Sequence, residues 1–412
     1  MRGSVDTTQN DLMRVLLSEG SGLTSRQVAT RLGGLGHHVE ILSSTPFCLT
    51  RFTRHVRALH EVPRFSDDPL QWFYAANRIA KARAIDVLLP TQEQVAVLSA
   101  LRARLEVATV VPDFAALRRV QDKIEAWRTL HAVGVPQPAS IVARGIDDLA
   151  TVTQFPVFVK RPISTASAGV RRASTEDELI AAATALGLGK YELLVQVQAA
   201  GALAMVQALA DRGRLIAHHA TLRIVEGIGG GAAVKESVRL PGLAVHLERL
   251  VQALGWHGPI SFDVIVADEG PLVIDVNPRL VEPINALFSG VDLVGAMLEL
   301  AKDGHPPALP AGKAGVRTRQ LLLCVLGAAE RGSRRAVLRE LITALEGLNE
   351  YEGAAEELTP VGGDLVSAIP IVVVALATLI EPSLWRRFYA GATGPYSLTP
   401  EAWQKIIAAG EQ

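Results

Sequence analysis

Residues 260–280 read ISFDVIVADEGPLVIDVNPRL, and this stretch decides the fold of the chain. Apolar and polar positions alternate on both sides of ADEGP, the period of two β-strands joined as a hairpin. A turn centred on Glu269 places Asp263 directly opposite Asp275, with Asn277 on the same face. Like charges that face each other across a strand pair are unfavourable, so this pair calls for a cation.

The chemistry of the hairpin suits a divalent ion. Two carboxylates and an amide oxygen fit Mg²⁺, which prefers oxygen ligands and keeps phosphate oxygens in its shell. Arg279 follows, where a guanidinium can hold a phosphate oxygen. Acids beside hairpin turns often bind nothing, so an ordinary hairpin is the alternative. Apolar neighbours such as Val264 and Val276 indicate a buried sheet, where unpaired carboxylates are costly, and they favour a metal–phosphate site.

Composition excludes several classes of protein. The chain has 412 residues, enough for two or three packed lobes, and its 49% hydrophobic content argues against disorder. A formal net charge of −1 gives no electrostatic reason to expect a nucleic acid partner. The two cysteines, Cys48 and Cys324, and a start without an apolar core lead us to expect a cytoplasmic protein without disulfides.

One apolar run, LVSAIPIVVVALATLI at residues 365–380, carries no charge and contains Pro370. A membrane-spanning helix needs roughly 20 apolar residues, so this run is short and interrupted. We expect a buried helix or a subunit interface, for example in a homodimer, rather than contact with a membrane.

The first 112 residues alternate strands with helices, which predicts a parallel, doubly wound sheet. No GxGxxG sequence is present, so we do not expect a dinucleotide site. The predicted elements are strands at 12–20, 38–44 and 85–90, and a helix at 25–35 with Ser25 as its N-cap.

The next part carries the lysines that phosphate chemistry needs. Lys160 ends an apolar strand at 156–160, and residues 164–169 have only small side chains, so backbone N–H groups can approach a polyphosphate. A surface lysine before a flexible loop is the alternative. Lys123, on a helix expected at 114–133, indicates by itself only a solvated helix face.

Other motifs are weaker or absent. Arg223 precedes the glycine stretch 227–231, which predicts either a mobile loop over a site or a sharp turn. No CxxC, HExxH or GxSxG sequence occurs, which excludes the familiar zinc protease and serine hydrolase motifs. The chain from about residue 302 onward is expected to be helical.

These pieces, in this order, resemble the ATP-grasp enzymes, most specifically in residues 255–280 and more loosely over about 12–301. The resemblance implies an α/β chain whose N-terminal doubly wound parallel-sheet lobe precedes two lobes with antiparallel sheets that clamp ATP. It implies an N-terminal domain at 1–112, an ATP-grasp domain at 113–302 with a lid lobe at about 137–200 and a larger lobe at about 201–302, and a helical C-terminal region at 303–412.

The resemblance also implies roles for residues. Asp263, Asp275 and Asn277 would bind Mg²⁺ (or Mn²⁺) at the ATP phosphates, and Arg279 would stabilise the transferred phosphoryl group. The remaining roles are phosphate contacts by Lys123 and Lys160, cover from Ser164, Ser167 and Gly169, adenine contacts from Gln196, Val197 and Ile265, and an acceptor pocket with Arg223. Gln196 stands where the family has an acid, and Leu203 and its neighbours offer no acid for the ribose.

The expected function is that of an ATP-dependent carboxylate–amine ligase acting on two small molecules. It would phosphorylate a carboxylate to an acyl phosphate, which an amine then attacks. Phosphoryl transfer to bicarbonate, a hydroxyl or a thiol is one alternative, and a regulatory nucleotide-binding protein with little turnover is another.

Overall fold

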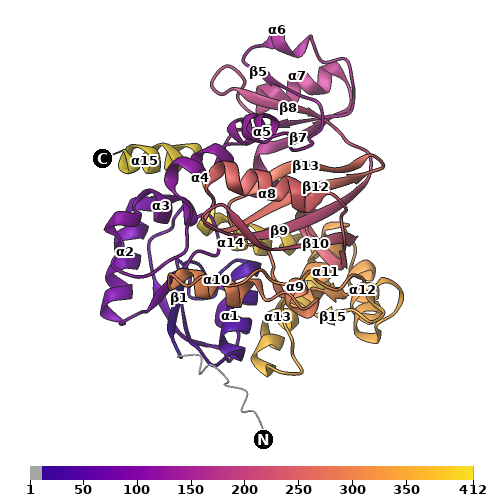
Figure 1. Cartoon of the computed structure of the whole chain (residues 1–412). Helices are drawn as coiled ribbons and strands as arrows, with labels where there is room; N and C mark the ends of the chain where they lie inside the picture. The colour runs from indigo at the N-terminus through magenta and orange to yellow at the C-terminus, as the bar shows by residue number, and fades with distance from the viewer. Residues whose placement is uncertain (1–11, 412) are drawn as a thin grey trace, which may run out of the picture.

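The computed structural model describes residues 12–411, except for the side chains of residues 166 and 167. Its sheets are a four-stranded parallel sheet, a four-stranded antiparallel sheet and a seven-stranded, mainly antiparallel sheet (Figure 1). The predicted fold class, with a parallel N-terminal lobe ahead of two antiparallel lobes, is confirmed. How the chain divides into domains stays a prediction.

The N-terminal sheet has the order β3-β2-β1-β4, with every pair parallel, as predicted. Its strands are β1 (Arg14–Leu17), β2 (His38–Ser43), β3 (Val56–Glu61) and β4 (Val87–Leu89), and its helices are α1 (Leu23–Gly34), α2 (Pro69–Ala82) and α3 (Val95–Ala100). The predicted N-cap was wrong. Gly22 is the N-cap of α1, and Ser25 lies inside the helix, where its hydroxyl donates a hydrogen bond to Thr91 after β4, at 2.7 Å.

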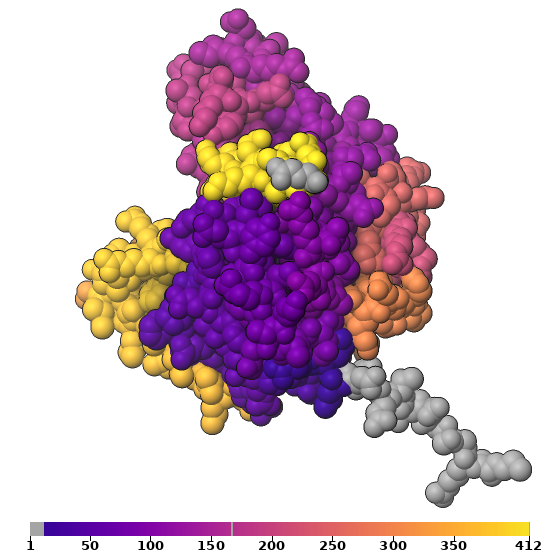
Figure 2. All heavy atoms as spheres, turned by 90° about the vertical axis from the view of Figure 1, so that its left-hand side faces the viewer, coloured from indigo at the N-terminus to yellow at the C-terminus, as the bar shows by residue number. Residues whose placement is uncertain are grey.

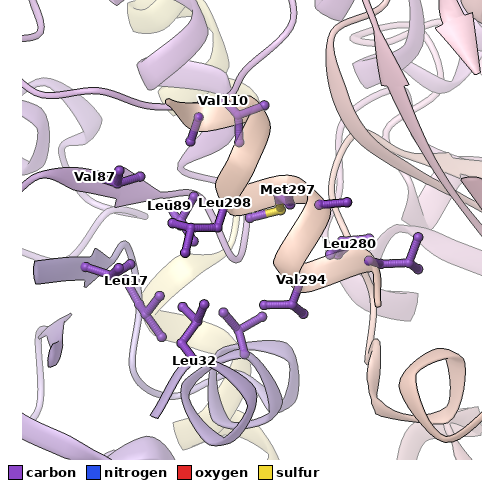
Figure 3. Close-up of a cluster of buried hydrophobic side chains, with 14 of the residues drawn as sticks. Leu17, Leu32, Val87, Leu89, Val110, Leu280, Val294, Met297 and Leu298 are labelled. Carbon is purple, nitrogen blue, oxygen red and sulfur yellow. The ribbon is translucent and has the colours of Figure 1, made fainter. Parts of the chain in front are cut away.

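A helix from far along the chain covers one face of this sheet. Val294, Met297 and Leu298 of α10 (Leu293–Ala301) belong to the same buried cluster as Leu17 and Leu89 (Figure 3). Burying such side chains stabilises the fold by roughly 1.5–3 kcal/mol each. The N-terminal lobe therefore depends on a segment that follows the hairpin.

The helix expected at 114–133 is two helices, α4 (Phe114–Gln121) and α5 (Lys123–Ala132). Asp122 breaks it, because its extended backbone lets its carboxylate accept the N–H groups of Ile124 (2.8 Å) and Glu125 (3.2 Å) as an N-cap. Lys123 thus occupies the first position of a capped helix.

The lid lobe has the strand order β5-β8-β6-β7. Its elements are β5 (Ser140–Ala143), α6 (Ile146–Leu149), β6 (Val157–Lys160), β7 (Val170–Ala173), α7 (Glu176–Ala185) and β8 (Leu193–Val197). Aliphatic side chains of β6, β8 and α7 form its own small core, with Val157, Leu179 and Leu193 fully buried.

The large sheet has the order β13-β12-β9-β10-β11-β14-β15. Its elements are β9 (Ala202–Asp211), β10 (Arg214–Glu226), β11 (Ala232–Val238), α8 (Leu243–Leu254), β12 (Gly258–Ala267), β13 (Gly270–Asn277), α9 (Ile284–Phe288), β14 (Arg317–Arg319) and β15 (Ala355–Glu356). Phe262 and Val264 face the core with α8, so their neighbour Asp263 faces the other side, toward the site.

The C-terminal region is mostly helical, although β14 and β15 join the large sheet. Its helices are α11 (Leu321–Glu330), α12 (Arg334–Glu346), α13 (Ala368–Ile380), α14 (Trp385–Thr393) and α15 (Pro400–Gly410). The expectation of a buried helix at 365–380 holds for one side of α13 only, since Val374 is buried while Leu376 and Ile380 are 57% and 69% exposed. Within residues 12–411 no helix is long and apolar enough to span a membrane.

The two cysteines, Cys48 and Cys324, are both free and buried.

Helix α15, drawn in yellow, lies across the N-terminal lobe just below the lid lobe (Figure 2). Its Trp403 and Ile406 pack into the second core of the N-terminal lobe.

A buried ion cluster joins the large sheet to the C-terminal region. The Lys235 ammonium, with no exposed side-chain surface, lies 2.5 Å from Glu282 and 2.6 Å from Glu357. Replacement by Lys235→Met leaves two buried carboxylates without a counter-ion. We expect a loss of about 3–5 kcal/mol in unfolding free energy, measured by urea denaturation. Lys81→Met, in an exposed pair with Glu106, is the control and should change stability by less than about 1 kcal/mol.

Candidate active site

The hairpin places Asp263 opposite Asp275, as predicted, but by a different route. Ala267 pairs with Gly270, so the turn is two residues long, and an unbroken ladder would set Asp263 against Ile274. A β-bulge after Asp263 shifts the register by one residue and restores the aspartate pair. The bulge therefore decides which side chain faces Asp263.

The bulge also creates a contact with the lid lobe. The Lys160 ammonium, at the end of β6, donates to the carbonyl of Ile274 at 2.6 Å and to the side-chain oxygen of Gln196 at 2.7 Å. Lys160 is 6% exposed, and burial lowers its pKa to about 8, a shift that Asp275 opposes. A buried cation is thus held at the edge of the aspartate pair.

Lys123 neutralises one of the two aspartates. Its ammonium lies 2.7 and 2.6 Å from the two carboxylate oxygens of Asp275. Burial alone raises the pKa of Asp275, but Lys123 and Lys160 outweigh it and hold that pKa below its usual range. Lys123, for which the sequence alone indicates only a solvated helix face, thus contacts Asp275 directly.

Asp263 is the acid without a partner. Among the described residues its carboxylate makes no ion pair or hydrogen bond, and burial together with Asp275 raises its pKa to about 6. Asn277 follows two residues after Asp275 and shares its face. These oxygen donors fit Mg²⁺. No cluster of three or more His, Cys, Asp or Glu within residues 12–411 is arranged to hold a metal, so phosphate and water oxygens would complete the shell.

The two arginines have different surroundings. Arg279 pairs with Glu93 at 3.2 Å, and both side chains are nearly buried. Arg223 pairs with Glu226 at 2.9 Å and donates to the carbonyl of Gly230 at 2.7 Å, which ties it to the glycine loop. The structure shows no contact between Arg223 and the aspartate pair within the described residues. Glu93 was missed in the sequence; its signal was its place after a strand of the predicted parallel sheet.

The small-residue loop after β6 is closed on itself and anchored at one point. The N–H of Arg161 donates to the carbonyl of Gly169 at 2.8 Å, and a side chain at Gly169 would meet Ser164 at 2.4 Å. The Thr165 hydroxyl accepts the N–H of Leu398 at 2.9 Å, a link to the C-terminal region that the sequence does not reveal. The Ser167 side chain lies outside the described part of the chain.

The residues expected at the adenine come from two sheets, Gln196 and Val197 from β8 and Ile265 from β12. The Gln196 amide is engaged by Lys160 and by the Ser140 hydroxyl (3.3 Å), and the N–H of Val197 donates to the carbonyl of Ala139 at 2.8 Å. Ile265 lies on the face of Asp263, two residues along β12. Their contacts with a purine stay predictions.

Comparison with known proteins gives no sequence relatives. No family model matches the chain, and no curated protein matches it. Several solved structures are similar, all at low identity. They include a biotin carboxylase–β,γ-ATP complex from Campylobacter jejuni (18% identity, TM-score 0.61, 74% of each chain) and an ATP complex of carboxyaminoimidazole ribonucleotide synthase from Aspergillus clavatus (14%, 0.63, 88% of this chain and 98% of that one). An L-amino acid ligase from Bacillus licheniformis follows (15%, 0.56, 70% and 74%). These similarities show the fold.

The pKa of Asp263 predicts how stability varies with pH. Its folded pKa of about 6 lies above the unfolded value of about 3.9, so its contribution is full below pH ~4 and is lost as pH rises through 6. Between pH 5 and 7 the wild type should lose about 1 kcal/mol relative to Asp263→Asn, as measured by denaturant unfolding without nucleotide. Asp268→Asn, in the exposed turn, should follow the wild type; parallel curves for wild type and Asp263→Asn would refute the assignment.

Proposed function

We propose that this chain, which has the ATP-grasp fold, is an ATP-dependent ligase that activates a carboxylate and couples it to an amine. The resemblance inferred from the hairpin is confirmed at the level of the fold. The observation that carries the proposal is the convergence of Lys123 and Lys160, from two other elements, on the opposed pair Asp263 and Asp275. Such a set of charges matches a triphosphate with its divalent ion.

Each group has a role in the first step, transfer of the γ-phosphoryl group from ATP to a carboxylate oxygen. Asp263, Asp275 and Asn277 would hold Mg²⁺, with Mn²⁺ as an alternative ion, which would supply positive charge against the phosphates. Lys123 and Lys160 contact the phosphates, in exchange for part of their present hydrogen bonds. This step gives an acyl phosphate and ADP.

In the second step the amine nitrogen attacks the acyl carbon and the C–N bond of the amide forms. The bond between that carbon and the phosphate oxygen breaks, phosphate leaves with its electron pair, and the nitrogen releases a proton to solvent. Arg279 stabilises charge on the transferring phosphoryl group and the acyl phosphate. Glu93 holds Arg279 in place through the 3.2 Å pair. Arg223 shapes the acceptor side through the glycine loop.

A carboxylating reaction is the second candidate, in which bicarbonate takes the place of the organic carboxylate. The similarity to a biotin carboxylase and to a carboxyaminoimidazole ribonucleotide synthase favours it. Both candidates share the acyl phosphate step, so they differ only in the acceptor and in the product. Mass spectrometry of the product separates them.

The test is release of ADP from ATP and Mg²⁺ with panels of carboxylates and amines, and with bicarbonate. We expect Arg279→Met to lower kcat by about 10²–10³-fold, because charge on the phosphoryl group loses its guanidinium, with little change in the affinity for ATP. Arg317→Met, which removes a similar ion pair with Glu236 at a distant strand, is the control and should keep its activity.

ATP binding without ADP release for any acceptor would refute the ligase. In that case the chain would be a nucleotide-binding regulatory protein. An Arg279→Met variant that retains full kcat would refute the role given to this arginine.

A further inference from the structure

Loops at the carboxyl ends of three parallel strands meet beside the active site. The N–H of Thr50, in the segment after β2, donates to the carbonyl of Gly20 at 2.8 Å. The Ser18 hydroxyl, at the end of β1, donates to the side-chain oxygen of Gln94 at 3.3 Å, after β4. The carboxyl ends of parallel strands are where open α/β sheets bind ligands.

Two buried polar side chains in these loops lack partners. The Thr50 hydroxyl and the side-chain nitrogen of Gln94 make no hydrogen bond within the described residues. Both residues are fully buried. Buried polar groups are nearly always satisfied, so two orphans in adjoining loops indicate a missing polar partner.

Glu19 adds an uncompensated charge to this cluster. It is 2% exposed, and one of its oxygens accepts the N–H groups of Gly20 (2.8 Å) and Ser21 (2.7 Å). No ion pair to Glu19 exists among the described residues, and burial raises its pKa to about 7. Glu93, in contrast, has Arg279 as its counter-ion. Glu19 is therefore the acid that a cationic ligand would satisfy.

Glu93, the residue before Gln94, places this cluster next to Arg279, with which it pairs at 3.2 Å. The C-terminal segment reaches the neighbouring small-residue loop after β6, where the N–H of Leu398 donates to the Thr165 hydroxyl at 2.9 Å. The cluster therefore adjoins the arginine that the proposed function places at the transferring phosphoryl group.

We propose that this cluster, defined by Glu19, Ser21, Thr50 and Gln94, binds the ammonium group of a substrate, with Glu19 as counter-ion. Two glutamates against one guanidinium disfavour an anion such as bicarbonate and favour a molecule with a free amino group, as in an amino acid. The side-chain nitrogen of Gln94 offers a donor for that molecule's polar oxygen. This inference rests on the proposed function and names the class of one of its substrates.

The test is calorimetric binding of standard amino acids, one at a time, to the full chain with Mg²⁺ and a non-hydrolysable ATP analogue. We expect at least one free amino acid to bind and its N-acetyl derivative to bind at least tenfold more weakly. Glu19→Gln should weaken binding of the free amino acid roughly 10- to 100-fold and leave the affinity for the nucleotide unchanged. Glu106→Gln, an exposed acid of the same lobe, is the control.

Equal binding of the free and N-acetylated forms, no binding of any amino acid, or an unchanged affinity in Glu19→Gln would each overturn the inference. The wild-type comparison decides the matter even if the variant does not fold. Amino acid binding without ADP release would leave the inference standing and refute the ligase. ADP release with a carboxylate and an amine whose binding is unchanged in Glu19→Gln would support the ligase and refute the inference.

Discussion

The mutual repulsion of Asp263 and Asp275 is the constraint on which the centre of this molecule depends. Opposite each other on a partly buried face, the two carboxylates persist because Lys123 reaches one of them and Lys160 stands at the edge of the pair. Those lysines come from α5 and from the end of β6, so their contacts with the hairpin hold three parts of the chain together. Within the described part of the chain Asp263 has no such counter-ion, and its pKa is raised by burial and by the charge of Asp275.

The alternation of apolar and polar residues along the sequence was enough to predict much of the fold and of the aspartate pair. The alternation in residues 260–280 predicted the hairpin and the facing aspartates, and the run of strands and helices before residue 112 predicted a parallel sheet. Where the sequence misled, a nonlocal contact or a single side chain had intervened. Ser25 bonds to Thr91 instead of capping α1, and Asp122 caps a second helix within 114–133. Asp263 still pairs with Asp275, because a bulge at Ile274 compensates for a turn one residue shorter than the one predicted.

The unpredicted part of the site comes from contacts between distant segments. Glu93 meets Arg279 across 186 positions of sequence, and Thr165 meets Leu398 across 233. Neither Glu93 nor Leu398 stands in a motif, and no spacing in the sequence links either of them to its partner, because each contact forms only when distant segments fold together. The sequence signal that could have identified such residues is their position just after a strand of the parallel sheet. Glu19 and Glu93 both have that position.

The packing of α10 beneath the first sheet limits how this chain can be rearranged. Leu17 and Leu89 are covered by Val294, Met297 and Leu298, which the chain supplies more than two hundred residues later. A fragment that ended before the hairpin would expose this surface to water and would aggregate. Any exchange of the first lobe for one from another protein therefore has to carry α10 with it, or supply an apolar helix face of the same shape.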